Sequence, residues 1–371
     1  MDAPRNRLPP EGERAPSFDP SAGSLVWGRA SAAETGLDAE QLRLADEAIR
    51  TSYPKIRCFV VAKDAQLVFE RYYGGADAAT AFDLRSATKS ATAAAAACAG
   101  LFGARAPALG ELFPADLPRT ASEALLATTA LDLLAMASGL HWASGPRLGE
   151  PFVPRMHRSR HWVRFALRLP VRPELQGVFL YRSADSHLLS AAVTAATNRP
   201  AAEIAQEAIF GPLGIAAPGW DADPQGHTVG HIGLRLTGEA LAKFGWLHAT
   251  GGVWEGRRLL PAEYVRLAWT PRGDGLPAFG RYGGHWWVAR AATGDVVRCA
   301  LGHGGQLVFA VPERRLVAAF AAEPKVSRWK HPLALFERYV LAADGTAAVP
   351  DPGRGLPPPA DVCNSGPFGV Q

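Results

Sequence analysis

The 371-residue sequence predicts an α+β fold in which an antiparallel sheet is flanked by N- and C-terminal helices and carries an inserted, mostly helical domain. Strand patterns occur early, at 57–71, and again late, at 306–321, whereas helical patterns dominate the middle of the chain. Strands from the two ends can share one sheet only if the ends meet in space, so the middle must form an insertion. We expect a ligand site in the cleft between the two parts, where pockets commonly form.

The individual elements follow from hydrophobic periodicity and turn residues. Apolar residues recurring every three or four positions predict helices at 37–52, 186–197, 201–209, 238–249 and 329–341, with shorter ones broken by proline and glycine between 105 and 178. Short apolar runs bounded by turn residues predict strands at 57–62, 66–71, 284–290, 306–311 and 316–321.

These elements predict one domain over residues 36–345, with the helical insertion at about 105–250. Residues 1–35 are rich in proline, glycine and charge, and we expect a mostly extended lead-in there. Residues 346–371 are rich in proline and glycine, which predicts a loosely held C-terminal tail.

Composition excludes several classes of protein. The formal net charge of +4 is spread along the chain, so no nucleic-acid partner is expected. No run of about 18 strongly apolar residues predicts a membrane span. The N-terminus lacks the apolar core of a signal peptide, which predicts a cytoplasmic location. The four cysteines have no metal-ligand spacing, so we expect free thiols, no metal and no other cofactor; no feature predicts an oligomeric state.

The most informative segment is R-S-A-T-K-S, in which Ser86 and Lys89 stand three residues apart at the start of an alanine-rich run. Residues at i and i+3 of a helix share a face, so the hydroxyl and the amine are expected side by side. A serine hydroxyl becomes a good nucleophile only when a neighbouring base takes its proton. A lysine held in a low-dielectric site can lose its charge and act as that base.

The residues that follow this pair favour a buried site over a capped surface helix. From Ser90 to Phe102 the chain carries no charge, whereas a surface helix normally has a charged face. A helix of small apolar residues belongs inside the protein, and it would bury Lys89 at its N-terminal end. Burying a lysine is costly unless it has a role or a partner.

Two later segments could complete such a site. Tyr181 lies in F-L-Y-R-S-A-D before an expected helix, and a phenol near a lysine can relay protons. His303-Gly304-Gly305 opens the strand that begins at Gln306, where glycines allow close approach of a substrate and open N–H groups can bind an oxyanion. A core aromatic and an ordinary glycine turn are the alternative interpretations of these segments.

Taken in order, R-S-A-T-K-S, L-L-A-M-A-S-G-L, Y-R-S-A-D, L-R-L-T-G-E-A-L-A-K-F-G and G-H-G-G-Q resemble the serine β-lactamase and penicillin-binding-protein superfamily over about residues 35–340. The class C, esterase-like branch, with 6-aminohexanoate-dimer hydrolases and EstB-type carboxylesterases, is the most similar. The resemblance implies an acyl-enzyme on Ser86, with Lys89 as proton acceptor and Tyr181 in proton transfer. It also implies an oxyanion hole formed by the backbone N–H groups of Ser86 and Gln306.

Two residues depart from the pattern of a dedicated β-lactamase. Ser183 stands where many class C enzymes have asparagine, and His303-Gly304-Gly305 replaces a K-T-G motif. We expect Ser183, His303 and both glycines to contact substrate, and β-lactamase activity to be weak or absent.

The sequence therefore predicts a serine hydrolase acting on a small-molecule ester or amide. Two alternatives remain open at this stage. The same acyl-enzyme could pass its acyl group to an acceptor other than water, as in an acyltransferase. The chain could also be a non-catalytic binding module that retains the cleft of such an enzyme.

Overall fold

The computed structural model describes residues 18–345 except 20, 104, 146–147 and 327–328. These residues form two compact units. The helical unit comprises Ser86–Leu234 and Leu259–Val288. The sheet unit comprises the described parts of Ser17–Arg85, Arg235–Arg258 and Ala289–Gln371. The expected tail at 346–371 and most of the expected lead-in lie outside the described residues, and the domain limits stay a prediction.

The main sheet of the sheet unit confirms that strands from both ends of the chain pair with one another. Its central pair joins β2 to β15 in antiparallel register, with Val60 opposite Ala319. All neighbours are antiparallel except β1, which runs parallel to β3. The strand order is β1 (Gly28–Arg29), β3 (Gln66–Tyr72), β2 (Ile56–Lys63), β15 (Leu316–Ala322), β14 (Gln306–Val311) and β13 (Val296–Gly302).

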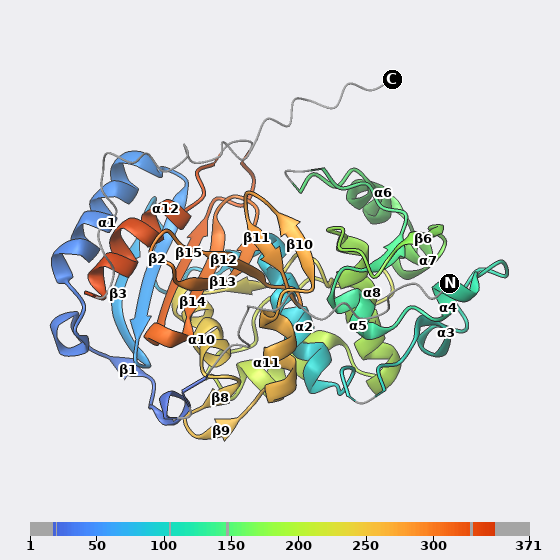
Figure 1. Cartoon of the computed structure of the whole chain (residues 1–371), viewed down its shortest axis with the longest axis horizontal. Helices are drawn as coiled ribbons and strands as arrows, with labels where there is room; N and C mark the ends of the chain where they lie inside the picture. The colour runs from blue at the N-terminus through green and yellow to red at the C-terminus, as the bar shows by residue number, and fades with distance from the viewer. Residues whose placement is uncertain (1–17, 20, 104, 146–147, 327–328, 346–371) are drawn as a thin grey trace. The chain divides into compact units, whose positions relative to one another are not determined.

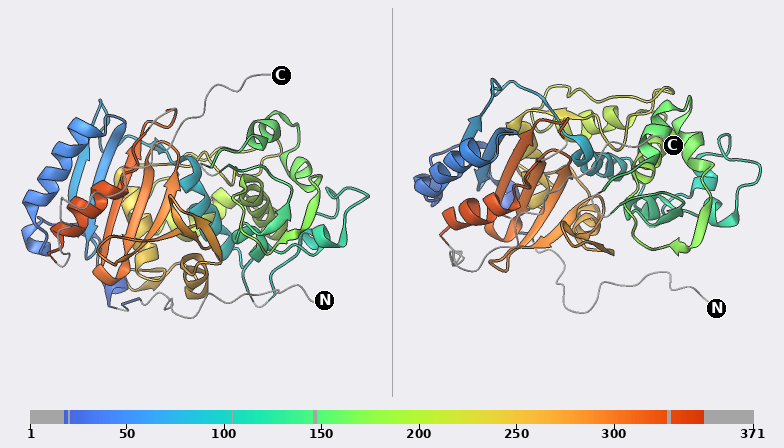
Figure 2. Two further views of the ribbon diagram at one scale, coloured as in Figure 1. Left: turned by 45° about the horizontal axis from the view of Figure 1, so that its top comes forward. Right: turned by 90° about the horizontal axis from the view of Figure 1, so that it is seen from above.

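Helices from the two ends of the chain flank this sheet, as expected. Figures 1 and 2 show α1 (Ala39–Ser52) beside α12 (Leu333–Leu335) on one face of the strands, and α10 (Gly238–Ala249) on the other. Asp38 caps α1 by accepting from the N–H groups of two first-turn residues. Gly245 lets α10 approach closely, because a Cβ there would lie 2.5 Å from a side-chain methyl of Val308.

Short elements complete the sheet unit. They are η1 (Ala22–Ser24), η2 (Ala33–Thr35), β4 (Phe82–Asp83), β7 (Arg235–Leu236), β8 (Val253–Trp254), β9 (Arg257–Arg258), η5 (Pro312–Arg314) and the π-helix η6 (Phe336–Leu341), which continues α12.

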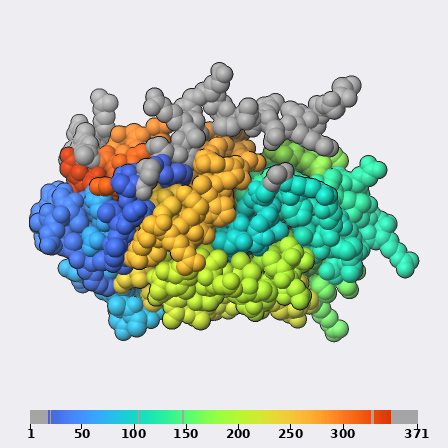
Figure 3. All heavy atoms as spheres, turned by 90° about the horizontal axis from the view of Figure 1, so that it is seen from below, coloured from blue at the N-terminus to red at the C-terminus, as the bar shows by residue number. Residues whose placement is uncertain are grey.

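The helical unit is built around α2 (Thr88–Cys98) and α8 (Ser183–Thr197), which pack against each other (Figure 1). The helix α9 (Ala201–Ala205) and the π-helix η4 (Gln206–Phe210), which follows it directly, also pack on α2. This part of the chain lies in the yellow-green band of Figure 3. The remaining elements are η3 (Arg85–Ala87) at the boundary between the units, α3 (Leu109–Leu112), α4 (Glu123–Leu126), α5 (Ala130–Leu134), β5 (Ser138–Leu140), α6 (Phe152–Arg158), α7 (Trp162–Leu167), β6 (Val171–Gln176), α11 (Ala262–Trp269), β10 (Gly273–Leu276), β11 (Gly280–Tyr282) and β12 (Trp287–Arg290), which crosses the boundary.

Some element predictions were wrong in detail. The strand expected at 284–290 begins only at Trp287, because Gly283 donates to the carbonyl of Trp286 and His285 has a positive φ of 63°. The closing helix expected at 329–341 begins after Pro332. Several elements were missed altogether, namely β6, β10, β11, α11 and β13.

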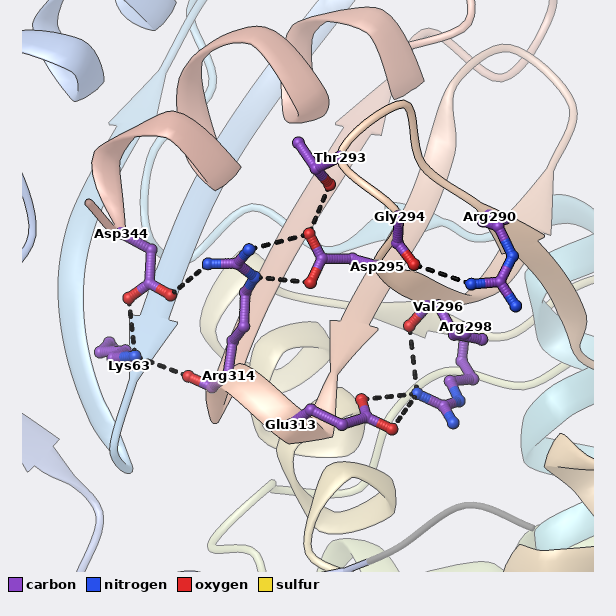
Figure 4. A network of polar contacts seen from close by, with 10 residues as sticks. All are labelled: Lys63, Arg290, Thr293, Gly294, Asp295, Val296, Arg298, Glu313, Arg314 and Asp344. Carbon is purple, nitrogen blue, oxygen red and sulfur yellow. Dashed lines mark hydrogen bonds and ion pairs between the residues drawn. The ribbon is translucent and has the colours of Figure 1, made fainter. Parts of the chain in front are cut away.

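A charged network fastens the C-terminal end of the described chain to the sheet (Figure 4). Arg314, in the turn between β14 and β15, donates to both carboxylate oxygens of Asp295 at 2.8 and 2.9 Å and to Asp344 at 3.1 Å. Lys63 at the end of β2 donates to Asp344 at 2.7 Å. Burial raises the pKa of Asp295, but hydrogen bonds from Arg314 and Thr293 outweigh burial and hold it below the ordinary value.

Replacing Arg314 with alanine is expected to lower the free energy of unfolding by about 2 kcal/mol, because it leaves the largely buried Asp295 carboxylate without its cation and Asp344 with Lys63 alone. The Asp295 pair stabilises the fold above about pH 4. This contribution is lost as the pH falls through the lowered pKa, so the deficit of the variant should shrink in acid. Chemical denaturation at pH 7 and pH 3 measures both effects. Arg290→Ala, which removes an exposed side chain bonded to one carbonyl, is the control and should change stability by less than about 0.5 kcal/mol.

Candidate active site

Ser86 and Lys89 lie side by side, one helical turn apart. Ser86 is in the 3-10 turn η3 and is partly exposed, whereas Lys89 is in the first turn of α2 and is 1% exposed. The Lys89 Nζ donates to Ser86 Oγ at 3.0 Å and to the carbonyl oxygen of His231 at 3.2 Å. The expected burial of this lysine is therefore confirmed.

Small residues and hydroxyl groups explain how α2 holds Lys89 inside the unit. Every residue from Thr88 to Ala97 is buried. Thr92 donates its hydroxyl to the carbonyl of Gly230, and the Thr88 hydroxyl accepts from the N–H of Leu234. The segment that carries His231 is thereby fixed along the helix. Gly230 is required at this contact, because a Cβ there would lie 2.0 Å from a backbone oxygen of α8.

Tyr181 packs over this pair immediately before α8. The Lys89 Nζ lies 4.9 Å from the centre of its ring, and Tyr181 itself is 3% exposed. Burial and the Glu150 carboxylate raise the pKa of the phenol well above 10, while a hydrogen bond with Ser86 opposes that rise. Trp287 stacks on the phenol ring at 6.0 Å between centroids. The phenol is therefore protonated and available as a proton donor.

Glu150 is a charged neighbour of the site that the sequence prediction missed. Its carboxylate accepts from the N–H and the hydroxyl of Ser183, both at 2.6 Å, and from Trp142 Nε1 at 2.7 Å. It thus binds the N-terminus of α8, where the helix dipole favours an anion. Burial raises the pKa of Glu150, and the charge of Lys89 and the Ser183 hydrogen bonds act against that rise. Both polar donors of Ser183, which we expected to contact substrate, are bonded to Glu150.

Two histidines near Lys89 have distinct environments. His285 is buried, and its Nδ1 donates to the carbonyl oxygen of Leu134 at 2.9 Å, because a carbonyl only accepts. Burial and the charge of Lys89 lower the pKa of His285 to about 3, so the imidazole is neutral with its proton on Nδ1. The Nε2 of His231 lies 2.9 Å from that of His157, so one of these two nitrogens carries a proton and the other does not.

The third predicted segment lies in the sheet unit. His303 Nε2 lies 2.7 Å from the carbonyl oxygen of Val326, and Gly304 and Gly305 have positive φ angles of 94° and 107°. The side-chain amide of Gln306 donates from Nε2 to the carbonyl oxygen of Ala322 and accepts at Oε1 from the N–H of Ala322. This amide therefore stabilises the pairing of β14 with β15. The binding roles predicted for His303, Gly304, Gly305 and Gln306 stay predictions.

Among the described residues, no group of three or more histidine, cysteine or acidic side chains could hold a metal ion. No helix within the same part of the chain is both long and apolar enough to cross a bilayer.

The fold and the Ser-Lys-Tyr cluster define a β-lactamase-like protein. The family model described as Beta-lactamase matches residues 58–332, and the chain therefore belongs to the beta-lactamase family. This finding confirms the resemblance drawn from the sequence motifs. The α+β fold class is confirmed as well. A comparison with the sequences of curated proteins gave no match.

Solved structures of low sequence identity share the fold. A protein provisionally assigned as a 6-aminohexanoate-dimer hydrolase from Bacillus anthracis is 18% identical, with a TM-score of 0.65 over 88% of this chain and 89% of that one. An octameric penicillin-binding protein homologue from Pyrococcus abyssi is 17% identical, with a TM-score of 0.60 over 82% and 77%. A D-stereospecific amidohydrolase from Streptomyces sp. is 15% identical, with a TM-score of 0.57 over 77% and 94%.

Proposed function

We propose that this protein is a serine hydrolase of the esterase-like branch, which cleaves a small-molecule ester or amide through an acyl-enzyme on Ser86. The observation that carries the proposal is the 3.0 Å contact between Ser86 Oγ and the buried Lys89 Nζ beneath the Tyr181 ring. Nucleophile and base lie within hydrogen-bond reach, as nucleophilic catalysis requires. The hydrolase names of two fold neighbours agree with this class of reaction.

In the proposed acylation step, the deprotonated form of the Lys89 amine takes the hydroxyl proton of Ser86 while Oγ attacks the substrate carbonyl carbon. The resulting oxyanion is stabilised by backbone N–H groups, and the candidates are those of Ser86, in η3 just before α2, and of Gln306. The protonated phenol of Tyr181 gives its proton to the leaving alcohol or amine as the bond to carbon breaks, and it regains a proton from Lys89.

In the proposed deacylation step, water attacks the acyl ester on Ser86. Its proton passes to the Lys89–Tyr181 pair, and the Ser86 oxygen recovers a proton as the acid leaves. All proton transfers use side chains of this chain, so the reaction requires no cofactor. His303 and its two glycines would bind the substrate rather than transfer protons.

A panel of p-nitrophenyl esters and short amides tests the function. Ester hydrolysis that depends on Ser86 supports the proposal, and the acyl-chain preference defines the substrate class. Turnover without an added acceptor distinguishes hydrolysis from acyl transfer, because a hydrolase releases free acid in step with p-nitrophenol whereas an acyltransferase stops after one acylation of Ser86. Hydrolysis that is equally fast in Ser86→Ala would refute the assignment.

Nitrocefin should be a poor substrate, with a kcat/KM at least about 100-fold below that of p-nitrophenyl butyrate. This β-lactam carries a carboxylate, and the Glu150 carboxylate lies within electrostatic range of Lys89 and Tyr181. Two like charges in a partly desolvated site repel by about 2–3 kcal/mol. Absorbance at 486 nm or the equivalent colour change measures turnover. Rapid nitrocefin hydrolysis would contradict the expected repulsion by Glu150 and would show that Ser183 and His303 do not exclude β-lactams.

A further inference from the structure

A buried ion pair, Arg182 and Asp185, lies directly next to Tyr181 in the chain. Both side chains are completely inaccessible to solvent, and Arg182 Nη1 lies 3.9 Å from Asp185 Oδ2. Ser138 donates its hydroxyl to the other oxygen of Asp185 at 2.7 Å. The proposed proton relay of Ser86, Lys89 and Tyr181 uses neither of these side chains, so the mechanism above leaves the pair without a role.

The Arg182 guanidinium is bonded to backbone carbonyls rather than to a surface partner. Its Nε donates to Leu140 at 2.9 Å, and its Nη1 donates to Met136 at 2.9 Å and to Leu180 at 3.4 Å. The Met136 carbonyl also accepts from the N–H of Leu180 at 3.0 Å. Leu180 and Arg182, the residues on both sides of Tyr181, therefore both donate hydrogen bonds to the carbonyl oxygen of Met136.

The backbone that receives these bonds is itself unusual. Met136 has a positive φ of 53°, a conformation that a long side chain rarely adopts. Such strain persists only where surrounding contacts over-determine the conformation. Arg182 supplies contacts of this kind, because a guanidinium offers five donors in a rigid plane and can hold several carbonyls at once.

Stability alone does not account for a buried ion pair. Replacing such a pair with apolar residues of similar volume is often neutral or stabilising, because removing two charges from water is costly. Burial lowers the pKa of Arg182 and raises that of Asp185 to about 7, so burial disfavours the charged form of both side chains. The hydrogen bonds by which Arg182 holds the backbone carbonyls around Tyr181 explain the presence of the pair better than stability does.

We propose that Arg182, held by Asp185, is a positioning residue that fixes the backbone around Tyr181 and thereby keeps the phenol over Lys89. The inference rests on the proposed function of Tyr181 in proton transfer. Arg182 acts through the backbone and does not touch the reacting atoms.

Kinetics of three variants test the role. Arg182→Met should lower kcat on p-nitrophenyl butyrate by about 10- to 100-fold, the cost of a small misplacement in a catalytic site, with KM changed less than about threefold. Arg182→Lys retains a cation but fewer donors and should recover part of the loss. The exposed Arg168→Met is the matched control and should behave as wild type. A folded Arg182→Met with the kcat of wild type would overturn the proposal.

A 19F NMR measurement tests whether Arg182 positions Tyr181 without relying on enzymatic activity. Protein with 3-fluorotyrosine in place of Tyr181 should give a 19F resonance that shifts or broadens in Arg182→Met and stays unchanged in Arg168→Met. If Arg182→Met does not fold, Asp185→Asn serves, because its amide oxygen still accepts from Ser138 but the negative charge is gone. An unchanged resonance in the folded variants would overturn the proposal.

The two readouts also separate this inference from the proposed function. A 19F shift in a protein that shows no Ser86-dependent hydrolysis supports the positioning of Tyr181 and refutes the hydrolase. Hydrolysis that depends on Ser86 together with an unchanged resonance supports the hydrolase and refutes the positioning. The pH dependence of kcat adds a further check. The charged groups that act on Asp185 are Arg182 and Asp132. If the Asp185 carboxyl causes an inflection of kcat near pH 7, Asp185→Asn should remove it.

Discussion

Ser86→Ala should lower kcat/KM for p-nitrophenyl butyrate by about 10⁴-fold or more, because loss of a catalytic nucleophile removes the covalent pathway altogether. The Ser86 hydroxyl is partly exposed and lies 3.0 Å from the buried amine of Lys89. Initial rates followed at 400 nm give the measurement. Thermal denaturation should show a folded protein, since a partly exposed hydroxyl contributes little to stability.

Ser90→Ala is the matched control for this substitution. Ser90 lies in the first turn of α2, four residues beyond Ser86, but its hydroxyl donates to the carbonyl of His285 at 2.7 Å in a buried position. Its loss should reduce stability by about 1 kcal/mol and leave kcat/KM within about threefold of wild type. Equal losses in the two variants would contradict the assignment of Ser86 as nucleophile.

Lys89→Met and Lys89→Arg should each lower kcat by about 10³-fold or more, because neither side chain can accept the proton of Ser86. Methionine retains the length of the stem without an amine. Arginine retains a positive charge that does not titrate in proteins. The pair of variants therefore separates the need for a base from the need for a cation. Steady-state kinetics at pH 7–9 provide the comparison.

Appreciable activity in Lys89→Arg would contradict the assignment of Lys89 as the proton acceptor. Such a result would mean that the cation beneath Tyr181 is sufficient, for example by lowering the pKa of a neighbouring group. Loss in Lys89→Arg together with full activity in Lys89→Met would show that the site needs neither a base nor a cation at this position.

The elements that the sequence predicted well are those with strong local patterns. The uncharged run after Lys89 predicted a buried helix, and α2 is buried along nearly its whole length. The early hairpin and the late strands were predicted to share a sheet, and β2 indeed pairs with β15. In these cases periodicity and turn residues contain the information, because burial on a helix or strand repeats at short range.

Most of the strands that were missed pair with their neighbour along the chain, and β6 pairs with β5 across a longer segment. Their pairing partners define these strands, and propensity alone does not predict such strands. The turn before β12 contains His285 in a left-handed conformation, which glycine patterns would not predict.

Glu150 illustrates the same limit within the site. It lies 33 positions from Ser183, to which it is bonded, and no motif contains it. The signal that could have indicated a partner was the N-terminus of α8, which begins at Ser183 without a side-chain cap from Arg182. A helix start of this kind requires an acceptor from elsewhere.

The most direct measurement is mass spectrometry of the protein after treatment with an active-site phosphonate. Trypsin cleaves after Arg85 and Lys89 and releases a four-residue peptide that contains Ser86. We predict one phosphonyl group per chain, located on Ser86 by fragmentation and absent from Ser86→Ala. An adduct on another residue, or undiminished labelling of Ser86→Ala, would contradict the assignment of Ser86 as the nucleophile.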